Sequence, residues 1–311
     1  MTQDASLGSA TPVQSRTIAP MVWVNGYRVS LDAPHLSAFD RGFTLADGVF
    51  ETIRVYRGRA FRLEAHIRRL SDAMSTLGIP LRSDLGSLVT GAVAEAGSTG
   101  LSEASVRVTV SRGVGPPGVA PPAAPEPTIV VAVTTPPAFS AEIYRNGLTV
   151  HVASGRRNER AMTAGLKTVA YTESVVAIAE ARATGADDAL FLDTEGHVSE
   201  GTSSNVFIAA TGDTRGTSAL LTPPLSCGAL PGITRAAVME LATRLGITVG
   251  VRPIEHDEIL ASPEVFLTSS LRGVAPVVRI DGRTIGAGRP GPLTRRVMDA
   301  YEALVGSECR E

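Results

Sequence analysis

Residues 187–210 read DDALFLDTEGHVSEGTSSNVFIAA, and this stretch decides how the rest of the chain is interpreted. An apolar run at 189–192 leads into the turn sequence DTEG at 193–196, and a second apolar run follows at 205–210. Asp and Gly favour turns between extended segments. The stretch therefore predicts a strand, a turn and a second strand.

Helices and further strands flank this pair in both directions. Upstream, LTVHVA at 148–153 reads as a strand, and a helix is expected over 170–184. Downstream, we expect a helix over 233–245, a strand in EVFLTSS at 264–270 and a last helix over 291–305. Strands and helices mix without a regular βαβ rhythm. The pattern favours an α+β (mixed α/β) fold over a Rossmann sheet.

The N-terminal half shows the same mixture. Its predicted elements are a hairpin at 21–30 that turns at Asn25-Gly26, a strand at 49–56, a hairpin at 56–63, helices at 64–78 and 84–97, and paired strands at 104–112 and 127–135. Between the last two strands, GVGPPGVAPPAAPEP at 113–127 contains too much proline for a helix or a central strand. It is either a functional lid or a flexible surface insertion.

This reading divides the chain into four parts. We expect a disordered tail at 1–17, an N-terminal α/β domain at 18–137, an interdomain linker at 138–146 and a C-terminal domain at 147–311. A chain of 311 residues is long enough for two domains with cores of their own.

Charge and composition exclude several classes of function. The net charge is −2, so neither a nucleic acid nor an anionic membrane is an expected partner. Apolar runs such as TIVVAV at 128–133 are too short to span a bilayer, and the N-terminus lacks a secretory signal. The two cysteines, Cys227 and Cys309, show neither metal-site spacing nor a disulfide framework. We expect no metal and a cytoplasmic location.

Lysine is almost absent from the chain. Of 29 Lys and Arg residues, only Lys167 is a lysine, and it lies within NERAMTAGLKTVAYTES at 158–174. A primary amine forms a Schiff base with an aldehyde cofactor, which a guanidinium group does not. The alternative is an ordinary surface lysine. The apolar, Ala-rich segment that follows favours a buried, catalytic amine.

Four further features suit a cofactor with a pyridine ring and a phosphate. Glu200, in HVSEGTSSN at 197–205, could pair with a protonated ring nitrogen, although an isolated Glu at a turn is usually a surface residue. PGIT at 231–234 opens a helix, and TSS at 268–270 ends a strand, so both offer anion-binding groups. Arg69 offers a bidentate guanidinium. Each phosphate ligand alone is a weak indication.

Taken together, these segments resemble the fold-type IV enzymes that depend on pyridoxal 5'-phosphate, also called class IV aminotransferases. The matching stretches are DRGFTLADGVFET (40–52), LEAHIRRL (63–70), LKTVAY (166–171), residues 187–207, LPGITR (230–235) and TSSLRGVAPV (268–277). The family includes branched-chain and D-amino-acid aminotransferases, (R)-selective amine transaminases and aminodeoxychorismate lyases.

The resemblance implies a role for each residue at a matching position. Lys167 would hold the cofactor as a Schiff base and move the proton, Glu200 would pair with the pyridine nitrogen, and Tyr171 would hydrogen-bond the ring 3-oxygen. The implied phosphate ligands are Arg69, Ile233, Thr234, Ser270 and Leu271. It also implies two α/β domains with the cofactor between them, and a homodimer in which one subunit helps to close the other's active site.

Substrate recognition is less sharply implied. The Arg-x-His pair that holds the carboxylate in D-amino-acid transaminases is missing from SRGVGPPG at 111–118. The remaining candidates for substrate contact are Phe50, Arg54, Arg107 and Arg112.

Three functions follow from these residues, in order of preference. The leading prediction is a transaminase that moves an amino group between a small or branched amino acid, of L or D configuration, or a primary amine, and a 2-keto acid. The second is an aminodeoxychorismate lyase, which releases pyruvate and 4-aminobenzoate. The third, a binding protein without turnover, is disfavoured because it would not need Lys167, Tyr171 and Glu200 together.

Overall fold

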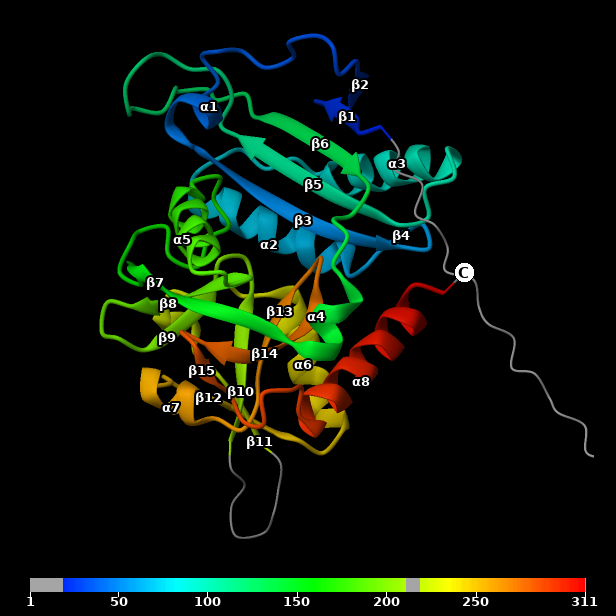
Figure 1. Cartoon of the computed structure of the whole chain (residues 1–311). Helices are drawn as coiled ribbons and strands as arrows, with labels where there is room; N and C mark the ends of the chain where they lie inside the picture. Colours follow the sequence, from blue (N-terminus) through cyan, green and yellow to red (C-terminus); the bar gives the residue numbers. More distant parts are fainter. Residues whose placement is uncertain (1–18, 211–218, 311) are drawn as a thin grey trace, which may run out of the picture.

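Two β-sheets, one above the other, organise the molecule in a computed structural model that describes residues 19–210 and 219–310 (Figure 1). The predicted tail at 1–17 lies outside the described residues. The mixture of helix and sheet confirms the predicted α+β class. Among the described residues, no helix combines the length and the apolar character needed to cross a membrane.

The upper sheet is antiparallel and comes from the N-terminal half of the chain. Its strand order is β2-β1-β6-β5-β3-β4. The strands are β1 (Met21–Val24), β2 (Tyr27–Val29), β3 (Gly48–Tyr56), β4 (Arg59–Ala60), β5 (Ala104–Ser111) and β6 (Thr128–Thr134). Helices α2 (Leu63–Thr76) and α3 (Leu85–Ser98) pack on this sheet through buried side chains such as Leu70, Met74 and Val89. A short helix, α1 (Arg41–Leu45), precedes β3.

The lower sheet is mixed and comes from the C-terminal half. Its order is β12-β11-β10-β13-β14-β7-β8-β9, with β15 added to β14. The strands are β7 (Leu148–Arg157), β8 (Asp188–Asp193), β9 (Val198–Gly201), β10 (Asn205–Ala210), β11 (Ala219–Thr222), β12 (Thr248–Val251), β13 (Val265–Ser269), β14 (Gly273–Ile280) and β15 (Arg283–Thr284). The stretch at 187–210 thus forms three strands where two were predicted, because a second turn separates β9 from β10.

Helices cover the lower sheet as the apolar spacing predicted. Helix α5 (Thr172–Ala183) packs on β7 and β8, and α6 (Ile233–Arg244) packs on β13. Helix α8 (Pro292–Glu308) lies against α6 and β14. A short helix, α7 (His256–Ala261), contributes Ile259 to a hydrophobic core formed with strands of the lower sheet.

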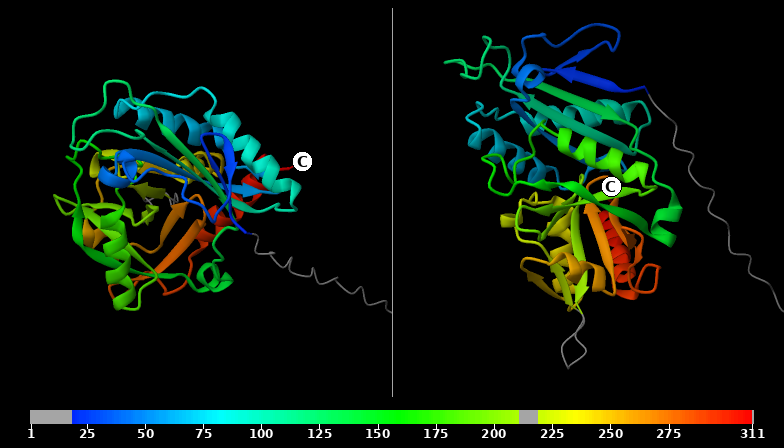
Figure 2. Two further views of the ribbon diagram at one scale, coloured as in Figure 1. Left: turned by 90° about the horizontal axis from the view of Figure 1, so that it is seen from above. Right: turned by 60° about the vertical axis from the view of Figure 1, so that its left-hand side comes forward.

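The segment between the two sheets carries a helix that was not predicted. Residues 136–147 pass from β6 to β7 and include α4 (Ala141–Asn146), which begins at the capping hydroxyl of Ser140. Figure 2 shows the two sheets from two further sides, with this segment crossing between them. Phe139 precedes α4 and lines the active-site cavity described below.

The Pro-rich loop at 113–127 is anchored to the body of the protein. The buried guanidinium of Arg41 donates to the backbone oxygens of Gly118, Val119 and Ala120 at 3.0–3.2 Å. Gly113 has a φ of +89°, and a Cβ there would lie 1.8 Å from the backbone oxygen of Glu126. These contacts fix the path of the loop and argue against a freely flexible insertion.

Candidate active site

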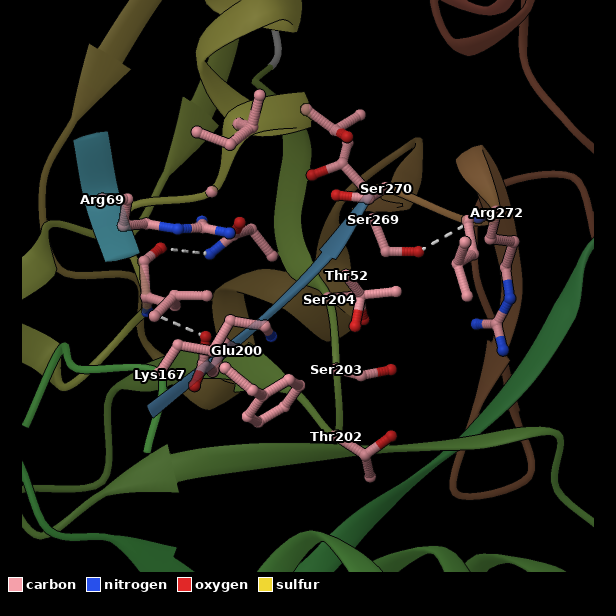
Figure 3. Close-up of a pocket in the computed structure, with 18 of the residues that line it drawn as sticks. Thr52, Arg69, Lys167, Glu200, Thr202, Ser203, Ser204, Ser269, Ser270 and Arg272 are labelled. Carbon is pink, nitrogen blue, oxygen red and sulfur yellow. Dashed lines mark hydrogen bonds between the residues drawn. The ribbon is translucent and has the colours of Figure 1, made fainter. Parts of the chain in front are cut away.

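A cavity of about 290 Å³ lies where the two sheets face each other. Side chains from both sheets line it: Phe50 and Thr52 on β3, Arg107 on β5, Arg69 on α2, Phe139, Lys167, Tyr171, Glu200 on β9, residues 202–205, 230 and 232–234, and residues 268–272. Figure 3 shows Lys167 and Glu200 on one side of the cavity and Ser269 and Ser270 on another.

Backbone hydrogen bonds to β3 position Lys167. The N–H of Phe50 donates to the oxygen of Lys167 at 2.9 Å, and the N–H of Val169 donates to the oxygen of Gly48 at 3.0 Å. The side chain then reaches into the cavity, where its Nζ lies 3.0 Å from the hydroxyl of Tyr171. The amine also lies 4.6 Å from the centre of the Phe50 ring. The chain's single lysine therefore faces an enclosed, partly aromatic site.

Glu200 presents a carboxylate to the same cavity from the end of β9. One oxygen accepts the Leu230 N–H at 2.9 Å, and the other lies 3.3 Å from the Arg157 guanidinium. Burial raises the pKa of Glu200, while the charge of Arg157 and the Leu230 N–H act in the opposite direction. A carboxylate in this setting would be stabilised by a cationic N–H group placed beside it.

The start of α6 lines the same cavity. Ile233 and Thr234 are its first residues, and no described side chain caps this end of the helix. Its first N–H groups therefore remain available to an anion. A Cβ on Gly232 would lie 1.9 Å from the side-chain oxygen of Asn205, so a larger residue there would displace Asn205. Ser270 and Leu271, between β13 and β14, line the same cavity.

Arg69 is held by a buried carboxylate that the sequence analysis missed. Its Nε and Nη2 donate to Glu51 at 2.6 and 2.7 Å, and its Nη1 donates to the oxygen of Pro231 at 2.8 Å. Burial alone would raise the pKa of Glu51, but hydrogen bonds from His66 and Arg69 bring it down to about 2. Arg69 therefore fixes α2 against the segment that precedes α6. Glu51 lies in the tripeptide FET at 50–52, which ends one of the stretches that carry the family resemblance. That position was the signal from which Glu51 could have been identified.

Two buried hydroxyls in the cavity wall have no hydrogen-bond partner among the described residues. These are Ser204 Oγ and Thr268 Oγ1, and both residues line the cavity. Buried polar groups are normally satisfied, so this pair indicates that a polar ligand completes the site. Thr268 belonged to the predicted TSS motif, whereas Ser204 was not singled out.

The four candidate substrate residues divide into two pairs. Phe50 and Arg107 line the cavity, with the Arg107 guanidinium 3.7 Å from the centre of the Phe50 ring. The Nε of Arg107 donates to the hydroxyl oxygen of Thr109 at 3.2 Å. No carboxylate among the described residues pairs with Arg107, and burial lowers its pKa. This guanidinium is therefore free to bind an anionic group.

Arg54 and Arg112 do not line the cavity, so the structure gives no support to their prediction as substrate ligands. Arg54 pairs with Glu103 at 2.7 Å and faces a separate hollow near α8. Arg112 donates to both oxygens of Asp47 at 2.7 and 3.0 Å and to the backbone oxygens of Leu77 and Gly78. Both guanidinium groups are already engaged by the protein.

Comparison with known proteins places the chain in one family. The family model described as "Amino-transferase class IV" matches residues 48–280. A putative branched-chain-amino-acid aminotransferase from Methanocaldococcus jannaschii is 33% identical over 284 residues, which cover 91% of this chain and 96% of that protein.

Two solved structures share the fold at similar sequence identity. The branched-chain amino acid aminotransferase from Escherichia coli has a TM-score of 0.85 and 29% identity, covering 94% of this chain and 96% of that one. The 4-amino-4-deoxychorismate lyase from Pseudomonas aeruginosa has a TM-score of 0.77 and 30% identity, covering 92% of this chain and 98% of that one.

The cavity suits the cofactor of this family. The Lys167 amine suits the cofactor's aldehyde, and the buried Glu200 carboxylate suits its ring nitrogen. The uncapped start of α6 suits its phosphate. The two unpartnered hydroxyls add polar groups for a bound ligand. A branched-chain aminotransferase that is 30% identical to this chain was solved with pyridoxamine 5'-phosphate. The chain belongs to the class IV aminotransferase family and is an aminotransferase that depends on pyridoxal 5'-phosphate.

Proposed function

We propose that this aminotransferase takes the amino group from small or branched amino acids, with Lys167 as its catalytic amine. The observation that carries the proposal is the position of Lys167 Nζ, 3.0 Å from the Tyr171 hydroxyl in the cavity that Glu200 also lines. The names of the M. jannaschii and E. coli relatives support branched-chain amino acids as substrates.

Lys167 acts in two ways in this proposal. Its amine would hold the cofactor covalently and, once free, would accept the proton from the substrate α-carbon. The Tyr171 hydroxyl, 3.0 Å away, orients that amine. The bound cofactor supplies a pyridine ring that withdraws electrons from the α-carbon. Lys167 would then return this proton to the bound cofactor.

Glu200 and the start of α6 hold the two ends of the cofactor in this proposal. The Glu200 carboxylate keeps a proton on the ring nitrogen, which the electron withdrawal requires. The N–H groups of Ile233 and Thr234 bind the phosphate, together with Ser270 and Leu271. Arg69 acts mainly by positioning, because its bonds to Glu51 and Pro231 fix the wall beside that phosphate.

Arg107 and Phe50 are our candidates for substrate binding. Arg107 is the cavity guanidinium without a carboxylate partner among the described residues, which suits a substrate carboxylate. The rings of Phe50 and Phe139 offer apolar surface to an aliphatic side chain.

A half-reaction screen tests the proposal. The purified enzyme is mixed with single L- and D-amino acids and (R)-amines while the absorption of the lysine-bound cofactor is followed. We expect rapid loss of this absorption with valine, leucine or isoleucine. Lys167→Ala, which has no lysine, should lack the absorption from the start and convert none of the donors. Loss with none of the donors, together with pyruvate release from aminodeoxychorismate, would establish the lyase reaction instead. The structural likeness to the P. aeruginosa lyase keeps that second function in view.

An exposed apolar patch supports the proposed homodimer. The patch consists of Phe39, Phe43, Val114 and Val119, and Phe43 and Val119 are 79% and 85% exposed. A bridge between Asp40 and Val114 and the Arg41 contacts hold its two segments together. Large exposed apolar patches commonly mark interaction sites. We propose that a second copy of the chain covers this patch.

Sedimentation at several protein concentrations tests the dimer. Phe43→Asp places a charge in the patch and should shift the wild-type dimer toward monomer. Tyr27→Asp, at a residue of similar exposure (78%) outside the patch, is the control and should leave the dimer intact. A wild-type monomer at all concentrations would refute this part of the proposal.

Two sequence-based predictions remain proposals. We place the domain boundary in the linker at 138–146, between the last strand of the upper sheet and the first strand of the lower sheet. A cytoplasmic location is supported by Cys227 and Cys309, which are both unpaired, as is usual in a reducing compartment.

A further inference from the structure

Three potential metal ligands meet at a junction outside the active-site cavity. Asp193 ends β8, His197 precedes β9, and Cys227 ends the short 3₁₀ helix Leu225–Cys227. One ligand atom from each residue lies within 4.8 Å of the other two. None of the three lines the cavity that contains Lys167. The sequence predicts no metal, because Cys227 and Cys309 show no metal-site spacing.

The backbone orients the Asp193 carboxylate. Its Oδ1 accepts the N–H groups of Glu195 and His197 at 3.0 and 2.8 Å. The other oxygen, Oδ2, faces His197 and lies 3.3 Å from its Nδ1. Carboxylates that bind metals are typically held by hydrogen bonds of this kind. Asp193 is thus fixed with one oxygen turned toward the junction.

His197 has a carboxylate on the far side of its ring. Its Nε2 lies 3.4 Å from Glu255, and a backbone bridge joins the two residues. Metal-binding histidines commonly donate their second ring N–H to a carboxylate, which fixes the orientation of the ring. Glu255 therefore supports His197 with Nδ1 directed at the junction. The His197 side chain is 21% exposed, which leaves a path for an ion from solvent.

We propose that Asp193, His197 and Cys227 bind one zinc ion. Oxygen, nitrogen and sulfur are the ligand types that Zn²⁺ takes, at bond lengths of about 2.0–2.3 Å. A tetrahedral site then needs ligand atoms roughly 3.3–3.6 Å apart. The 3.3 Å between Asp193 and His197 already meets this need. The Cys227 sulfur, within 4.8 Å of the other two ligand atoms, has to close a gap of about 1.5 Å at most. Its thiol releases its proton to solvent on binding, and water fills the fourth position.

The site would act on the segment that supports the cofactor. Cys227 lies three residues before Leu230, whose N–H holds Glu200. A zinc ion on Cys227 would tie the start of this segment to β8 and β9. This consequence depends on the proposed role of Glu200, whereas the zinc site itself does not.

Calorimetric titration of the holoenzyme with zinc chloride tests the site. The protein carries no affinity tag and is first treated with a chelator. We expect one zinc ion per chain, and at least about 100-fold weaker binding in Cys227→Ala and His197→Gln. Cys309→Ala removes the chain's only other cysteine, which is also buried, and should bind as the wild type does.

A spectroscopic readout separates ligation from unspecific binding. With cobalt chloride, the wild type and Cys309→Ala should show thiolate-to-cobalt absorption that Cys227→Ala lacks. Thermal unfolding with chelator present checks that each variant is folded. If Cys227→Ala does not fold, His197→Gln takes its place in the zinc titration, because His197 is partly exposed. Equal zinc affinity in Cys227→Ala and the wild type, or no zinc binding by the wild type, would overturn the proposal.

Discussion

The carboxylate of Glu200 lies 3.3 Å from the guanidinium of Arg157, which in turn lies 4.3 Å from the centre of the Phe191 ring. Burial raises the pKa of Glu200 and the charge of Arg157 opposes this shift. The pair, together with the Leu230 N–H, holds a carboxylate ready for a cationic partner in the cavity. The proposed contact to the cofactor's ring nitrogen depends on this arrangement.

Replacing Glu200 by Gln should therefore slow catalysis more than it weakens cofactor binding. The neutral amide does not hold a proton on the ring nitrogen, so we expect kcat to fall by about 100- to 1,000-fold. Absorbance of the dialysed protein measures how much cofactor is retained. Glu173→Gln is the matched control, since Glu173 also pairs with Arg157, at 3.2 Å, and does not line the cavity. Equal losses in the two variants would contradict the role of Glu200.

Arg107→Gln should separate amino acids from simple amines. Loss of charge-assisted hydrogen bonds to a substrate carboxylate costs roughly 2–3 kcal/mol, so KM for an amino acid should rise about 30- to 150-fold. A primary amine without a carboxylate has no such bond to lose. Arg54→Gln is the control, because Arg54 is paired with Glu103 outside the cavity. A similar change for both kinds of substrate would argue against carboxylate binding.

Arg112 should matter for stability instead of substrate binding. In Arg112→Met, Asp47 loses a bidentate partner and keeps only Arg41 at 2.9 Å, and the backbone oxygens of Leu77 and Gly78 lose their donor. We expect the free energy of unfolding to fall by about 3 kcal/mol, with KM unchanged at temperatures where the variant is folded. Denaturant unfolding measures the first quantity and steady-state kinetics the second. A raised KM with unchanged stability would restore Arg112 as a substrate ligand.

The buried Glu51 should make the protein sensitive to acid. Its pKa is lowered from 4.5 to about 2 by His66 and Arg69, against the effect of burial. A lowered folded-state pKa gives stability that is present above pH 4.5 and is lost as the pH falls toward 2. The loss amounts to about 3 kcal/mol. Glu51→Gln removes the titrating group, so its unfolding free energy should fall less over this range than that of the wild type. Parallel curves would contradict this assignment.

All the proposed cofactor residues line the cavity, whereas only two of the four proposed substrate residues do, and the reason is geometric. Short local motifs contain the three central residues, with Lys167 and Tyr171 in one and Glu200 in another. Each motif can be identified from its neighbouring residues in the sequence alone. The arginines depend on which face of a strand they occupy. Arg107 is paired with Thr52 across β5 and β3 and so faces the cavity. Arg112 follows the end of β5, five residues on, and turns to Asp47.

Buried partners are the second kind of feature that the sequence does not reveal. Glu51 is adjacent to Phe50 on β3, but successive strand residues point to opposite faces, so Glu51 meets His66 and Arg69 of α2 instead of the cavity centre. Only the packing of α2 on the sheet brings these groups together. The meeting of Cys227 with Asp193 and His197 likewise arises from the fold.

Borohydride reduction of the holoenzyme, followed by trypsin digestion and mass spectrometry, tests the central claim most directly. Reduction makes the bond between cofactor and amine permanent, and trypsin does not cleave at the modified lysine. The account predicts a labelled peptide spanning residues 161–182, between Arg160 and Arg182, with the label on Lys167. A label confined to the amine of Met1, or no label in an enzyme that turns over, would contradict it.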